Sequence, residues 1–160
     1  MDRAVIIQPL KPFDVPDATE IIARNPLWQR YGLTFDSVQQ VLLEGLKRSN
    51  GIYSARIEAR LVGLIWFDVT GTFYHSGYIR WVAVHPDFQN RGLGKILLKF
   101  AEEKILSVGP NVFLLVSHFN RSAQRFYERL DYRKVGELPD FYKQGITEWI
   151  YRKTVGPIVS

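Results

Sequence analysis

The sequence contains no cysteine and only three histidines. The missing cysteine excludes disulfides, thiolate metal sites and a cysteine nucleophile, which is the most common route to a covalent acyl-enzyme. His75, His85 and His118 are not arranged at helical i, i+4 spacing, and no dense carboxylate cluster accompanies them. We therefore expect no metal site. Any acyl transfer by this chain is expected to be direct.

Long apolar runs are also missing. No stretch approaches the roughly 20 apolar residues that cross a bilayer, and the start of the chain lacks an apolar segment before a small-residue cleavage site. The sequence has no repeat, low-complexity tract or linker, and 46% hydrophobic residues in 160 are ample for one packed core. We expect a soluble, cytoplasmic protein with one domain over residues 1–160 and no membrane partner.

The net charge of +5 does not select a partner by itself. It would suit nucleic acid, an anionic membrane surface or a phosphate-rich small ligand. The basic residues are scattered instead of forming a block, which is typical of a solvated surface. The aromatic residues fall mostly on apolar segments and are not interleaved with basic residues. We therefore expect no nucleic acid partner.

The residue pattern predicts two helices near the N-terminus. Asp14 begins a capped helix that ends before Pro26. Ser37 and Gln40 form a capping-box pattern for the second helix, for which Asn50-Gly51 is the stop signal. The stretch that joins the two helices contains several apolar residues, and we expect it to be an ordered loop.

Strand patterns follow, and they indicate an α+β sandwich. The expected strands cover residues 52–57, 61–69, 78–84, 112–116, 132–138 and 146–153. The first three are joined by short turns and predict an antiparallel meander. A helical period over residues 92–107 predicts a crossover to a parallel neighbour. Asn120 is expected to cap a last helix.

An anion cradle is predicted directly after the strand at 78–84. The segment reads His85-Pro86-Asp87-Phe88-Gln89-Asn90-Arg91-Gly92-Leu93-Gly94-Lys95 and leads into the amphipathic helix. Gly92 and Gly94 lack Cβ atoms, so backbone N–H groups can approach a phosphate at the positive end of a helix dipole. Arg91 and Lys95 add full positive charges. A Gly-x-Gly at a helix start also occurs in ordinary turns, so the motif alone does not name the ligand.

The order of residues around this cradle resembles the acyl-CoA-binding motif of the GNAT superfamily. In that family Gln/Arg-x-x-Gly-x-Gly/Ala holds the pyrophosphate of coenzyme A, and Gln89-x-x-Gly92-x-Gly94 has the same spacing. The segment from Leu115 to Tyr132 resembles the family's later motif, with Asp131 in place of the usual glycine. An aspartate can adopt the left-handed C-cap conformation at modest cost. The resemblance is strong over residues 52–153.

The resemblance implies the GNAT fold, with a mixed, mostly antiparallel sheet of about seven strands flanked by about four helices. It also implies acetyl-CoA as cosubstrate, in a cleft where the fourth and fifth strands splay beside Val84 and expose backbone amides to the thioester. Asn120 would reach the pantetheine arm or only cap its helix. The residues expected to contact the cofactor are Val82, Ala83, Val84, Gln89, Asn90, Arg91, Gly92, Leu93, Gly94, Lys95, Asn120, Ala123 and Phe126.

Aminolysis of a thioester needs a neutral amine, a stabilised oxyanion and a proton for the departing thiolate. Tyr127 resembles the family's proton-donating tyrosine, although its place on an apolar stripe also suits a core aromatic. The base does not carry over, because Tyr78 and Leu115 stand where relatives place a glutamate. His118, Glu148 and a water molecule are the alternatives.

The sequence thus predicts an N-acetyltransferase that moves an acetyl group from acetyl-CoA to a primary amine of a small molecule, peptide or protein, by direct attack in a ternary complex. The loop at 139–145 is expected to line the acceptor side. The alternatives are a non-catalytic acyl-CoA-binding or regulatory module, which the missing carboxylate base favours, and a basic RNA- or ribosome-associated protein. The acceptor is not specified, and a homodimer is left open.

Overall fold

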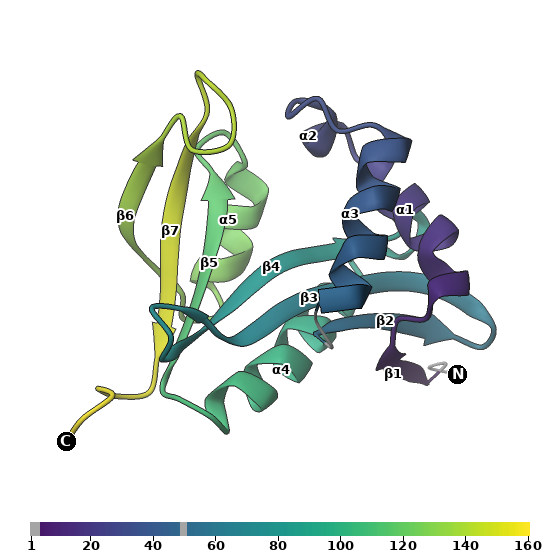
Figure 1. Ribbon diagram of the computed structural model, residues 1–160. Helices are drawn as coiled ribbons and strands as arrows, with labels where there is room; N and C mark the ends of the chain where they lie inside the picture. Colours follow the sequence, from purple (N-terminus) through teal and green to yellow (C-terminus); the bar gives the residue numbers. More distant parts are fainter. Residues whose placement is uncertain (1–3, 49–50) are drawn as a thin grey trace. The chain divides into compact units, whose positions relative to one another are not determined.

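The strands form one mixed sheet in the order β1-β2-β3-β4-β5-β7-β6 (Figure 1). The computed structural model describes residues 4–48 and 51–160. The strands are β1 (Val5–Pro9), β2 (Ile52–Ile57), β3 (Arg60–Thr72), β4 (Ser76–Val84), β5 (Asn111–Ser117), β6 (Arg133–Pro139) and β7 (Thr147–Thr154). The helices are η1 (Pro12–Asp14), α1 (Val15–Ala23), α2 (Pro26–Gln29), α3 (Phe35–Arg48), η2 (Pro86–Phe88), α4 (Leu93–Leu106) and α5 (Arg121–Glu128). The predicted α+β class and its mixed sheet are confirmed.

The chain divides into two compact units. Unit 1 comprises Met1–Phe67 and Trp81–Ala101, and unit 2 comprises Asp68–Arg80 and Glu102–Ser160. Strands β3 and β4 and helix α4 contribute residues to both units. The single domain over residues 1–160 stays a prediction. Among the described residues, no helix has the length and apolar character that crossing a membrane requires.

The core of unit 1 lies on both faces of its strands. Buried apolar side chains of α1 and α3, such as Ile22 and Leu42, pack with Leu64 and Trp66 of β3. Alternate residues of β3 face α4. Gly63 is one of them, since a Cβ atom added to it would lie 3.1 Å from the Leu97 side chain. The antiparallel β2–β3 hairpin was predicted from its alternation and is confirmed.

Unit 2 is built around β5, β6 and β7. Strand β5 pairs antiparallel with β7 over its whole length, and β7 pairs antiparallel with β6. Parallel pairing of β4 with β5, at Gly77–Ile79 and Val112–Leu114, confirms the predicted crossover. Helix α5 is tied to β7, since the Tyr151 hydroxyl donates to Glu128 Oε1 at 3.0 Å.

Two helix starts differ from the sequence prediction. Helix α3 begins at Phe35, because Thr34 and Ser37 cap it reciprocally: the Ser37 N–H donates to Thr34 Oγ1 at 3.2 Å and the Thr34 N–H donates to Ser37 Oγ at 2.9 Å. Ser37 therefore occupies the third helical position and is not the N-cap. The Asp14 side chain does not cap α1. It is buried, accepts the Lys11 N–H at 3.0 Å and pairs with Arg56.

One strand and one α-helix were not predicted, and one signal cannot be checked. Strand β1 is an edge strand that pairs antiparallel with β2. The expected ordered loop before α3 contains the short helix α2, capped by Asn25, so the described residues hold five α-helices where about four were expected. Asn50, half of the predicted stop signal after α3, lies outside the described residues.

Candidate active site

The predicted cradle lies within unit 1, between η2 and the start of α4. Its backbone is turned twice into the left-handed region, at Asn90 with φ 60° and at Gly92 with φ 79°. A Cβ on Gly92 would meet nothing within 4 Å. The glycine is therefore favoured by backbone conformation, and the space beside it is open to a ligand. Gln89 braces the loop from the strand side, since its Nε2 donates to the Val84 carbonyl at 3.2 Å.

The amide groups of the cradle are available to an anion. The Ile96 N–H donates to the Gly92 carbonyl at 3.1 Å. For the amides of residues 90–95, no backbone or side-chain acceptor is found in the part of the chain that the structure describes. These are the orphan donors of a helix N-terminus, where the helix dipole favours negative charge. Leu93 is buried and fixes the helix start, while Arg91 and Lys95 are exposed.

The residues expected to meet the thioester end β4. Ala83 is buried in the core of unit 1, and Val82 and Val84 are half-buried. These three residues follow the short parallel ladder, which reaches only Ile79 on β4. Of the three, only Ala83 belongs to the buried core cluster, and their role toward the thioester stays a prediction.

The second motif lies in unit 2, at the end of β5 and in α5. Asn120 is the N-cap, because its Oδ1 accepts the Ala123 N–H at 3.1 Å. This confirms the capping role and leaves its side-chain NH₂ group as the part that could reach a ligand. Ala123 and Phe126 are half-buried on the same helix, and the rings of Phe126 and Tyr127 lie 5.2 Å apart.

Tyr127 is held by the way α5 ends. Asp131 adopts φ 70°, as the sequence predicted for the residue that replaces glycine. The Tyr132 N–H donates to the Tyr127 carbonyl at 3.1 Å and the Asp131 N–H to the Glu128 carbonyl at 3.2 Å, the bonds of a Schellman motif. The Tyr132 ring thereby returns to within 5.5 Å of the Tyr127 ring.

The Tyr127 hydroxyl keeps its proton at neutral pH, and its role as a proton donor stays a prediction. Burial raises the pKa of Tyr127 to about 12, so the group is protonated at neutral pH. No hydrogen bond from this hydroxyl is found among residues 4–48 and 51–160. By contrast, the Tyr132 hydroxyl is engaged, and it donates to Glu102 Oε1 at 2.9 Å.

Comparison with known proteins decides the family. The model of the Acetyltransferase (GNAT) family matches residues 16–132. The chain belongs to the GNAT acetyltransferase family. An acetyltransferase of Pectobacterium atrosepticum is 32% identical over 82 residues, which are 51% of this chain and 56% of that protein. The match thus spans about half the length of this curated relative.

Solved structures of GNAT proteins share the fold. A GNAT-family protein of Desulfovibrio desulfuricans superposes with a TM-score of 0.78 at 25% identity, covering 96% of this chain and 100% of that one. An aminoglycoside 6′-N-acetyltransferase complexed with coenzyme A gives a TM-score of 0.74 at 17% identity, covering 95% of this chain and 98% of that one. At this identity the second likeness concerns the fold.

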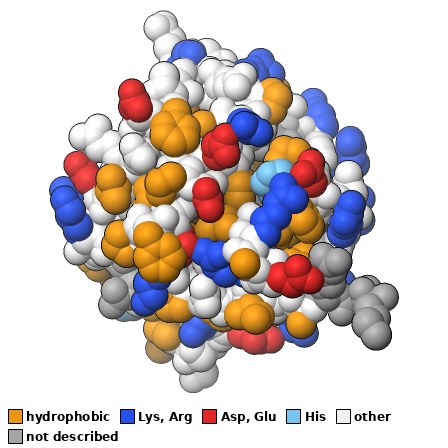
Figure 2. Space-filling view, turned by 90° about the vertical axis from the view of Figure 1, so that its right-hand side faces the viewer, with side chains coloured by type: hydrophobic (Ala, Val, Ile, Leu, Met, Phe, Trp, Pro, Cys, Tyr) orange, Lys and Arg blue, Asp and Glu red, His pale blue; other side chains and the backbone are white. Residues whose placement is uncertain are grey.

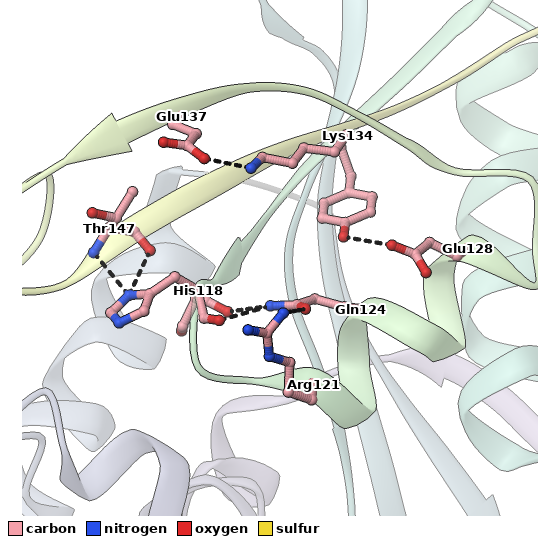
Figure 3. A network of polar contacts seen from close by, with 9 residues as sticks. His118, Arg121, Gln124, Glu128, Lys134, Glu137 and Thr147 are labelled. Atoms are coloured by element: carbon pink, nitrogen blue, oxygen red, sulfur yellow. Dashed lines mark hydrogen bonds and ion pairs between the residues drawn. The ribbon is translucent and has the colours of Figure 1, made fainter.

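The His118 ring is held by the backbone of Thr147 at the start of β7. Its Nδ1 lies 3.2 Å from the Thr147 nitrogen and 3.3 Å from the Thr147 carbonyl oxygen (Figure 3). The same carbonyl accepts the His118 backbone N–H at 2.9 Å. Either tautomer of the neutral ring therefore finds a partner on Thr147, and the tautomer with its proton on Nδ1 leaves the Nε2 lone pair free. The ring also lacks a carboxylate partner among the described residues.

Glu148 is one of two buried carboxylates of unit 2, the other being Glu102. It lies on β7, where Ser117 of β5 and Leu138 of β6 are its pairing partners. Its charge acts on Tyr78, whose hydroxyl is 3.2 Å from that of Tyr142. Burial first, then Tyr142 and Glu148, raise the pKa of Tyr78 well above its usual range, against a lowering effect of Arg80. Tyr78 therefore stays protonated and is no base.

The loop between β6 and β7 is closed on itself. The Gly145 N–H donates to Asp140 Oδ1 at 2.6 Å, and the Asp140 N–H donates to the Ile146 carbonyl at 3.1 Å. The loop presents Phe141 and Tyr142, which are 52% and 58% exposed. Sequence reasoning placed this loop beside the acceptor but did not foresee its bond to Tyr78.

Sequence reasoning also missed Gln124, which holds the end of β5. It is buried, and its Nε2 donates to the carbonyls of Ser117 at 3.1 Å and His118 at 3.0 Å (Figure 3). Its Oε1 accepts from Arg121 at 3.3 Å. In the sequence, the only signal for Gln124 is a polar residue on the apolar face of an amphipathic helix. No group of three or more His, Asp or Glu able to hold a metal exists within the described residues.

Proposed function

We propose that this chain is an acetyl-CoA-dependent N-acetyltransferase acting on a primary amine of a small molecule, peptide or protein. The observation that supports it best is the cradle at the start of α4, with unengaged amides, two left-handed turns and open space beside Gly92. These features suit a diphosphate. Membership of the Acetyltransferase (GNAT) family also supports this proposal.

In the proposed reaction, the cradle holds the diphosphate of acetyl-CoA and the amides of Val82–Val84 stabilise the oxyanion. The neutral amine attacks the thioester carbonyl directly, forming the C–N bond as the C–S bond breaks. Tyr127 donates its proton to the departing thiolate. The amine loses a proton to Glu148 or to water, because His118 has no carboxylate partner among the described residues to orient its ring. The acceptor side is formed by the loop that carries Phe141 and Tyr142.

A non-catalytic acyl-CoA-binding module is the second candidate, because the positions of the family's glutamate hold Tyr78 and Leu115. A nucleic-acid-binding protein is less well supported. On the face in Figure 2, lysine and arginine side chains are interspersed with aspartate and glutamate, and no continuous basic field forms there. Phosphate-backbone binding depends on such a field.

Ligand-induced stabilisation tests the binding step. Saturating acetyl-CoA should raise the melting temperature, since a ligand of the native state alone stabilises by about 2.7 kcal/mol at 100 times its Kd. Gly92→Asp should abolish the shift by placing a carboxylate in the cradle. Gly32→Asp is the matched control, because Gly32 has φ 76° and, like Gly92, nothing within 4 Å of an added Cβ. Equal shifts in the two variants, or a shift with RNA alone, would contradict the proposal.

Release of free thiol across a panel of amines tests catalysis. We expect transfer to α-amines or lysine-like amines and none to matched alcohols or thiols. Binding of acetyl-CoA with no thiol release for any amine would favour the non-catalytic module. Transfer to hydroxyl or thiol acceptors only would contradict the amine assignment.

A further inference from the structure

Arg60 contacts the loop that precedes the cradle from the start of β3. Its Nη2 donates to Asp87 Oδ2 at 3.0 Å, and its guanidinium lies over the Phe88 ring at 5.0 Å from the centroid. The same Nη2 is 3.2 Å from His85 Nε2. His85 Nδ1 in turn accepts the Asp87 N–H at 3.1 Å, which ties the ring to the turn that Arg60 contacts.

The β2–β3 hairpin that carries Arg60 is itself held in place by side-chain contacts. Arg60 pairs with Ile57 across the β2–β3 turn. Arg56 closes that turn, since its Nη1 donates to the Ala59 carbonyl at 2.7 Å, and it is anchored by an ion pair with the buried Asp14. The guanidinium of Arg60 is therefore presented from a braced hairpin.

The far side of the same loop carries the cradle. Arg91, one of the residues expected to bind phosphate, lies over Phe88 at 5.6 Å from the ring centroid. Phe88 is thus shared by a guanidinium from β3 and a guanidinium from the cradle. Asp87 and His85, the other contacts of Arg60, belong to the turn that sets the direction of the chain into Gln89 and Asn90.

We propose that Arg60 is a positioning residue for the phosphate cradle, an inference that rests on the proposed function. It holds the η2 turn through Asp87 and Phe88, and so fixes where Arg91 and the cradle amides point. Its own charge is matched by Asp87, so it acts through the loop and not by direct attraction of the phosphates.

Substitutions of Arg60 and Asp87 distinguish positioning of the loop from direct attraction of the phosphates, because the two actions change the Kd for acetyl-CoA differently. Arg60→Gln should raise the Kd and KM for acetyl-CoA about threefold to tenfold, the range of an exposed ion pair plus a cation–π contact. It should raise KM by more than it lowers kcat. Asp87→Asn should also raise the Kd, and the double variant should add little to either change. Arg60→Lys should recover part of the affinity, because it restores the ion pair without the planar contact on Phe88.

Arg24→Gln is the matched control. Arg24 lines the same pocket of about 230 Å³ as Arg60 and His85, but its ion pair is with Glu20 of its own helix, at 2.7 Å. Calorimetry with acetyl-CoA should give it the wild-type Kd. A tighter Kd in Asp87→Asn would overturn the inference, as it would show Arg60 acting by charge. An Arg60→Gln chain that melts earlier but binds with wild-type Kd would overturn it too. A wild-type chain that binds no acetyl-CoA would instead remove the proposed function.

Discussion

Tyr127→Phe separates a catalytic role from a structural one. The substitution removes a hydroxyl that makes no hydrogen bond within the described residues, while the ring keeps its contacts with Phe126 and Tyr132. Stability should therefore change by no more than about 0.5 kcal/mol. Turnover should fall by ~10² or more, the usual contribution of a positioned general acid. Acetyl-CoA affinity should hardly change, because the cradle is untouched.

The pH dependence sharpens the expectation. Since burial raises the pKa of Tyr127 to about 12, the donor stays protonated through the working range. The wild-type rate should show no falling limb from this group below pH ~11. The folded-state pKa lies above the ordinary value of about 10, so the associated stability is complete below pH ~10 and is lost as pH rises toward about 12. Tyr127→Phe should flatten that alkaline loss.

Tyr132→Phe is the control, for which we expect a loss of stability and little change in turnover. Its hydroxyl donates to Glu102, a buried carboxylate that also binds Lys153 at 3.0 Å. Removing it should cost about 1–3 kcal/mol, because a buried acceptor loses a partner. Chemical denaturation and single-turnover rates on the two variants give the result. Wild-type turnover in Tyr127→Phe would assign that side chain to the core and refute the reasoning.

Two further predictions address the base and the end of α5. His118→Ala should change the rate little, and the pH–rate profile should follow the amine, near pH ~8 for an α-amine or ~10 for a lysine. A rising acidic limb that is present in the wild type and lost in the variant would establish His118 as the base. Asp131→Gly should stabilise the chain by about 0.5–1 kcal/mol in urea titrations, since φ 70° suits glycine, and Asp131→Val should destabilise it. A less stable Asp131→Gly would show that the aspartate side chain contributes a contact of its own.

Local signals predicted most of the elements. The β2–β3 hairpin, the crossover helix α4 and the Asn120 cap depend on alternation, helical period and capping chemistry within a few residues. Strand β1 was missed because three apolar residues followed by Gln8-Pro9 give too short a pattern, and only pairing with β2 makes it a strand. The cap of α3 was misassigned because Thr34 and Ser37 both fit an N-cap.

The candidate site divides in the same way. The cradle was predicted because its glycines, its charges and its helix start are contiguous in sequence. Arg60, Gln124 and the Tyr78–Tyr142 pair were not, since each acts across tertiary contacts that no spacing encodes. The contacts of the His118 ring with the Thr147 backbone, 29 residues away in the chain, are of the same kind.

The loop between β6 and β7 is closed by hydrogen bonds between its own residues. Asp140 joins the two ends of the loop through hydrogen bonds with Gly145 and Ile146, and none of these residues belongs to β6 or β7. Tyr142 also contacts Tyr78, which ties the loop to β4. The residues expected to bind the cosubstrate diphosphate lie elsewhere in the chain. Under the proposed function, a library of substitutions at positions 141–144 should therefore change acceptor preference and leave acetyl-CoA affinity unchanged.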